Sequence, residues 1–128
     1  MESGTGIRAL NAAYLLGERM DEEDNYMQVL LDRATGETLA VGGWKEGRGV
    51  SITLQKSFCI ILEEHYEENT AERLTTIMDN RGKTCYRSDT AYCYAWKKDY
   101  LMMKRGIYQG IADRYGNWII RSVAGWSE

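Results

Sequence analysis

Proline is absent from this 128-residue chain, and histidine occurs only once. Proline usually makes up roughly 5 % of a protein and shapes many of its turns, so the turns here must be built differently. Thirteen glycines are available for that role, together with asparagine and aspartate. Any chemistry that depends on imidazole could use only His65.

Cysteine is also scarce, because the chain has only Cys59, Cys85 and Cys93 and no Cys-x-x-Cys pair. This pattern argues against a disulfide framework and a zinc knuckle, so we expect reduced, mostly buried thiols. No apolar run approaches the roughly 18 residues needed to span a bilayer; the run 58–62, for example, has five. The first residues also lack the pattern of a signal peptide. We expect a cytosolic protein that makes no membrane contact.

The material for a globular core is nevertheless present. Hydrophobic residues make up 44 % of the chain and charged residues 27 %, both near the average of globular proteins. A chain of this length buries roughly two-thirds of its unfolded surface around one core. The sequence therefore predicts a single domain over residues 1–128.

Charge is divided unevenly along the chain. Residues 1–80 contain seven Lys/Arg and fifteen Asp/Glu, whereas residues 81–127 contain nine and three. The basic segment also holds nine of the fourteen aromatic residues, namely Tyr86, Tyr92, Tyr94, Trp96, Tyr100, Tyr108, Tyr115, Trp118 and Trp126. Cationic and aromatic side chains in one segment are typical of a binding face.

Three segments share a turn pattern in which an aspartate ends an apolar run and a glycine follows before the next run. The aspartates are Asp32, Asp79 and Asp113. An aspartate can bond its own backbone in a turn, and glycine accepts the positive φ that such turns require. Each segment predicts a β-hairpin. Strands are expected at 26–32, 38–44, 50–55, 107–112 and 118–123, and 92–96 alternates with Tyr92, Tyr94 and Trp96 on one face.

Two segments favour helices. Residues 7–20 place Ile7 and Leu10 at helical spacing, and residues 57–79 place Phe58, Ile61, Leu62 and His65 at i, i+3, i+4 and i+7. The run 58–62 would equally suit a buried strand, and 88–104 could form a helix in place of a strand. The predicted fold class is α+β, a mainly antiparallel sheet built from β-hairpins with one or two packed helices.

No motif predicts catalysis, a cofactor or a metal. His65 lies among four glutamates, but no established zinc spacing is present, and nothing fixes its geometry relative to Cys59. The glycine-rich stretch 42–49 contains neither GxxxxGK[ST] nor GxGxxG, so a loop or glycine bulge is the favoured interpretation. We expect no catalytic residues; an activity of His65 with a carboxylate, or of a cysteine, is the alternative.

The basic aromatic segment allows several interpretations. It could bind a protein, or bind single-stranded nucleic acid through residues 81–121. It could also pack against the acidic half, within the fold or in a homo-oligomer. The acidic stretches 18–24 and 63–72 could imitate phosphate spacing and occupy a cationic groove on another protein.

A binding protein fits these features better than an enzyme. Small acidic chains without recognisable motifs are common among accessory proteins of phages and mobile elements, many of which block a host protein. The first hypothesis is a non-enzymatic inhibitor or adaptor of a larger protein partner, such as a nucleic-acid-processing or defence complex, in the manner of an anti-CRISPR. The residues predicted to contact the partner are Trp96, Lys97, Lys98, Tyr100, Lys104 and Arg105.

Overall fold

The computed structural model describes residues 6–97 and 99–123, and these residues form twelve β-strands and no helix. The strands are β1 (Gly6–Leu10), β2 (Tyr14–Met20), β3 (Tyr26–Asp32), β4 (Thr38–Lys45), β5 (Arg48–Leu54), β6 (Phe58–Glu67), β7 (Thr70–Asp79), β8 (Thr84–Ser88), β9 (Ala91–Ala95), β10 (Leu101–Arg105), β11 (Tyr108–Ala112) and β12 (Trp118–Val123). The predicted α+β class is therefore wrong, and the fold is all-β.

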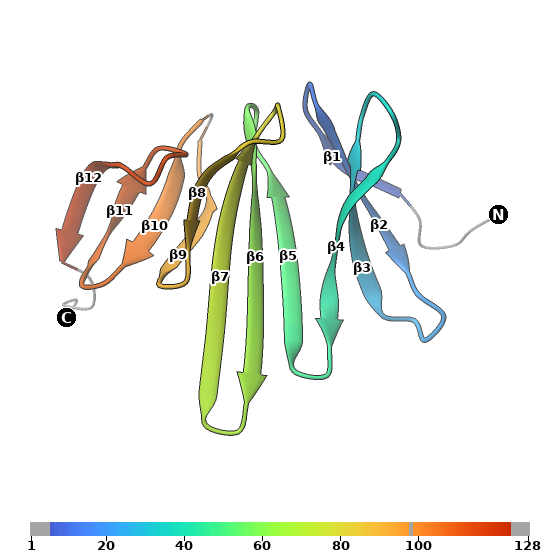
Figure 1. Ribbon diagram of the computed structural model, residues 1–128, viewed down its shortest axis with the longest axis horizontal. Coiled ribbons are helices and arrows are strands. Elements are labelled where there is room, and N and C mark those ends of the chain that lie inside the picture. The colour runs from blue at the N-terminus through green and yellow to red at the C-terminus, as the bar shows by residue number, and fades with distance from the viewer. Residues whose placement is uncertain (1–5, 98, 124–128) are drawn as a thin grey trace.

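The strands form two antiparallel sheets in chain order (Figure 1). Sheet A contains β1 to β8 and sheet B contains β9 to β12. The three predicted hairpins are confirmed, because Asp32, Asp79 and Asp113 each accept two backbone N–H groups of the turn that follows. Asp21 does the same between β2 and β3.

The predicted helix over residues 7–20 is wrong, because β1 and β2 form a hairpin there. Asn11 closes the turn: its Oδ1 accepts the N–H groups of Ala13 and Tyr14. Tyr14 and Leu16 then alternate inward while Leu15 is only half-buried, the pattern of a strand with one core face.

The predicted helix over residues 57–79 is also wrong, because β6 and β7 form a long hairpin. Phe58, Cys59 and Ile60 are consecutive and all buried. Phe58 and Ile60 pack in the core against sheet B, whereas Cys59 packs on the other side with residues of β2, β3 and β5. A strand covered on both faces needs no alternation, so its apolar run imitates a helical pattern.

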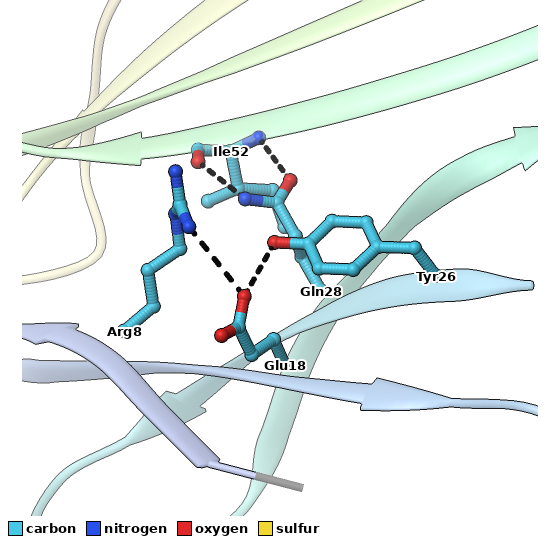
Figure 2. Close-up of polar contacts among 5 residues, drawn as sticks. All are labelled: Arg8, Glu18, Tyr26, Gln28 and Ile52. Atoms are coloured by element: carbon cyan, nitrogen blue, oxygen red, sulfur yellow. Dashed lines mark hydrogen bonds and ion pairs between the residues drawn. The ribbon is translucent and has the colours of Figure 1, made fainter. Parts of the chain in front are cut away.

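Sheet A curls so that it packs partly on itself. The pairing of β4 with β5 runs only from Lys45 opposite Arg48 to Gly43 opposite Val50. Beyond that point β2 and β3 lie over β5, which buries Leu16, Leu30 and Ile52 together. On the same face as Leu16, nearer the β2–β3 turn, Glu18 lies opposite Gln28 and accepts hydrogen bonds from Arg8 and from the Tyr26 hydroxyl (Figure 2).

Candidate functional site

Sheet B buries one side against sheet A and leaves the other side open. Cys93, Leu101, Met103 and Ala112 lie in the core between the sheets. We call the opposite side the outer face. It is defined by alternation and register and consists of Tyr92, Tyr94, Met102, Lys104, Gln109, Ile111, Ile120 and Ser122. The prediction that Tyr92 and Tyr94 share a face opposite Cys93 and Ala95 is confirmed, because both tyrosines are exposed while Cys93 is buried and Ala95 half-buried.

The outer face carries an apolar row that crosses all four strands. Tyr94 lies opposite Met102, Met102 opposite Ile111, and Ile111 opposite Ile120. Tyr94 is 51 % exposed and Ile120 is 65 % exposed. Because scattered single apolar residues are normal on a surface but an aligned row is not, this row is the strongest interaction feature of sheet B.

A polar row runs beside the apolar row, with Tyr92 opposite Lys104, Lys104 opposite Gln109, and Gln109 opposite Ser122. The ring of Tyr92 lies edge-on to that of Tyr94, with centroids 6.0 Å apart. Its other neighbour is Arg73 of β7, whose guanidinium carbon is 4.5 Å from the ring centroid. Tyr92 therefore joins the outer face to the lower part of sheet A.

Four of the six predicted contact residues are exposed, three of them at one end of sheet B and the fourth nearer the other end. Trp96, Lys97 and Tyr100 lie in the turn between β9 and β10, and Lys104 lies in the polar row. The ammonium of Lys97 is 5.6 Å from the centre of the Trp96 ring, within range of a cation–π contact. Lys98 lies outside the described residues.

Arg105, the sixth, points the other way. Its Nη1 donates to the Tyr86 hydroxyl at 2.7 Å and to the Gly116 carbonyl at 3.2 Å. Its guanidinium also lies over the rings of Tyr86 and Trp118. Arg105 thus joins β8 of sheet A to sheet B within the fold, and its contact with a partner stays a prediction.

The topology brings the acidic stretches of the sequence to one end of sheet A. The turns β2–β3, β4–β5 and β6–β7 lie at the same end of sheet A (Figure 1). They carry Glu22, Glu23, Asp24, Glu46, Glu67 and Glu68. The uneven charge along the sequence therefore places negative charge at one end of sheet A. Sheet B, in contrast, exposes cations that include Lys97 and Lys104.

Two exposed aromatic residues were missed by the sequence analysis. Trp44 of β4 and Tyr66 of β6 stack with ring centroids 5.9 Å apart. They lie 22 positions apart in the chain and meet only because β5 sets their register. The sequence carries no local signal for this pair, because the pairing depends on the register of three strands.

Burial suppresses the reactivity of the thiols. It raises the pKa of Cys59 to about 12 and that of Cys93 to about 11, and it also raises the pKa of the half-buried Cys85. Thiols with such pKa values stay protonated near pH 7 and are poor nucleophiles.

His65 lies 3.6 Å from a carboxylate oxygen of Glu67 and 3.8 Å from one of Glu72. Within residues 6–97 and 99–123, no group of three or more His, Cys, Asp or Glu side chains could hold a metal ion.

No protein-family model matches this chain, and comparisons with curated proteins and with solved structures found no match either. In the part of the chain that the structure describes, no helix could cross a bilayer. Function is therefore inferred from the residues of this chain alone.

Proposed function

We propose that this protein is a non-enzymatic, cytosolic binding protein that inhibits or adapts a larger protein partner through the outer face of sheet B. The observation that carries the proposal is the apolar row from Tyr94 to Ile120, left open on one side of a sheet whose other side contributes Cys93, Leu101, Met103 and Ala112 to the core. An aromatic and aliphatic row flanked by a lysine has the composition of an interface centre with a polar rim.

The acidic end of sheet A supports a partner with a cationic surface. Carboxylates at three neighbouring hairpin tips would steer the protein toward positive charge and raise the rate of association. Proteins that handle nucleic acid carry such surfaces to hold phosphates. A nucleic-acid-processing or defence complex is therefore the class of partner that we propose.

A pull-down from cytosolic extract, with and without nuclease, tests the proposal. A partner recovered in stoichiometric amount after nuclease treatment would support it. That partner must also be lost with the Tyr94→Ser/Ile120→Ser variant, which removes both exposed ends of the apolar row. Recovery of the same partner in the same amount by that variant would refute the outer face as the binding surface.

A second candidate function is binding of single-stranded nucleic acid by the same face. Its support is that Tyr92 and Tyr94 occupy alternate positions of β9, with Lys104 opposite Tyr92. Trp96 and Lys97 follow directly after the end of β9 and contact each other. This function predicts an affinity that falls steeply with salt and is lost in Lys97→Glu/Lys104→Glu. Unchanged affinity of that folded variant for an oligonucleotide would exclude it.

A further inference from the structure

A groove lies along the half of the β6–β7 hairpin that is nearer its turn, and it is separate from the apolar row of the outer face. It encloses about 670 Å³ between residues of β5, β6 and β7 and the turn before β9. The charged residues that line it are Arg48, Glu63, Glu64, Glu72, Arg73 and Asp89. By alternation, the side chains of Glu64 and Arg73 share the face of Tyr66, whereas those of Glu63, Glu72 and Arg48 project from the other face of the sheet. Among the charged residues of this lining, the Tyr66 face thus carries Glu64 and Arg73, and Asp89 adds a second carboxylate from the turn before β9.

Tyr66 lines this groove, and Trp44 stacks beside it. The two rings are nearly parallel, with an interplanar angle of 15°, so they turn their faces in the same direction. Trp44 is 56 % exposed and Tyr66 is 44 % exposed. Two large, partly exposed rings at a groove form a platform on which a flat or cationic group can lie.

Gly49 explains why the indole of Trp44 lies flat on the sheet. A Cβ atom at position 49 would come within 2.5 Å of the indole Cε2 atom. Glycine at this position therefore lets the ring rest on the backbone of β5 while Trp44 remains more than half exposed. The platform is fixed by the local backbone rather than by burial.

The carboxylate of Glu64 supplies negative charge beside the platform. One of its oxygens accepts the hydroxyl hydrogen of Tyr66 at 2.9 Å and hydrogen bonds from Arg73 at 3.4 Å. Arg73 in turn lies over the ring of Tyr92. This internal guanidinium, held between a carboxylate and a ring face, shows the arrangement that an incoming arginine would find over Trp44 and Tyr66.

We propose that this groove binds a cationic segment of a protein partner, with an arginine or lysine side chain lying over the Trp44–Tyr66 rings. Charge complementarity selects this occupant: the carboxylates of Glu64 and Asp89 line the groove against the one guanidinium group of Arg73. Glu46, Glu67 and Glu68 stand at the neighbouring hairpin tips and add further negative charge. The negative ring faces add to the same preference. An anionic peptide or a nucleic-acid strand would meet repulsion here.

The site does not depend on the outer face, so it is tested separately with a short peptide. The probe is acetyl-Gly-Arg-Gly-Arg-Gly-amide, titrated into the full chain while the indole N–H signals are followed by nuclear magnetic resonance. Trp44→Phe assigns the Trp44 signal. We expect saturable binding that shifts this signal, and at least tenfold weaker binding of a matched peptide with glutamine in place of both arginines.

Two variants separate the platform from the overall charge. Trp44→Ala keeps every charge and should weaken binding about tenfold. Glu22→Gln/Glu23→Gln removes two charges from the distant β2–β3 tip and should change binding by about twofold or less. Equal losses in both variants, no saturable shift of Trp44, or tighter binding of oligothymidylate than of the arginine peptide would each overturn the proposal. If Trp44→Ala is unfolded, Tyr66→Leu serves for the same comparison.

Discussion

The side-chain amide of Gln28 pairs with the backbone of Ile52 as a neighbouring strand would. Its Nε2 donates to the Ile52 carbonyl at 3.2 Å, and its Oε1 accepts the Ile52 N–H at 3.0 Å (Figure 2). Continuing the register from Gly43 opposite Val50 would place Val41 there, but β4 has separated from β5. Gly42 permits the close approach of β4 to β5 where the two strands part, because a Cβ atom there would lie 2.7 Å from the Val50 carbonyl oxygen. The Gln28 side chain thus supplies the hydrogen bonds that Ile52 would otherwise make to β4, which the curl of sheet A moves away.

Replacing Gln28 with leucine should therefore destabilise the fold. Both Ile52 backbone groups would be left buried without partners, at a cost of about 2–3 kcal/mol in the free energy of unfolding. Urea unfolding measures this loss. Gln109→Leu on the outer face is the matched control and should change stability by less than about 0.5 kcal/mol. Equal stability of the two variants would mean that the Gln28 amide contributes nothing to the curl.

Gly49→Ala should displace the Trp44 indole from the sheet, because the added Cβ occupies the space of the ring. The loss of the stack with Tyr66 should cost about 1 kcal/mol and change the near-ultraviolet circular dichroism. In a Trp44→Ala background the same substitution should cost almost nothing, since no ring remains to be displaced. A cost that is independent of Trp44 would contradict this explanation.

Stability should fall as pH rises above about 9. Burial raises the pKa of Cys59 to about 12 and that of Cys93 to about 11 in the folded state, whereas an unfolded thiol ionises near pH 8.5. The folded state therefore holds more protons than the unfolded state in this range, which favours unfolding as pH increases. The Cys59→Ala variant should lose stability less steeply, by about 1.4 kcal/mol per pH unit between pH 9 and 11. Parallel curves for the two proteins in urea unfolding under reducing conditions would show that this thiol ionises normally.

Arg105→Met should destabilise the contact between the two sheets. The variant keeps an apolar stem but loses the hydrogen bonds to Tyr86 and Gly116 and the contacts with two rings. We expect a loss of about 2 kcal/mol by chemical denaturation. Lys104→Met, one residue away on the outer face, should leave stability nearly unchanged. A larger effect at Lys104 than at Arg105 would be incompatible with the orientation of β10.

The turns and several strands were predictable because their chemistry is local. An aspartate that caps its own turn, followed by glycine, identified three hairpins, and 26–32 and 118–123 match β3 and β12. The central hairpin was not predictable in this way. Phe58 to Ile60 is buried on both faces by segments far away in the chain, which removes the alternation that identifies a strand.

The candidate site was predictable in composition but only partly in geometry. The sequence identified Trp96, Tyr100 and Lys104 as exposed material for binding, and the structure places all three at the surface. Arg105 has the parity of the buried Leu101 and Met103, so a strand assignment of 101–105 would have indicated its inward direction. The Trp44–Tyr66 pair could not be found, because it requires the register of three strands.

The most direct test of the outer face compares partner capture by two variants with equal loss of exposed apolar surface. Tyr94→Ser/Ile120→Ser alters the apolar row, and Tyr115→Ser/Ile7→Ser alters residues of the same exposed fractions elsewhere, 51 % and 65 %. The predicted result is that a nuclease-resistant protein partner captured by the unmodified chain is lost only with the first variant. Loss with both variants, or with the control variant alone, would contradict binding through the outer face of sheet B.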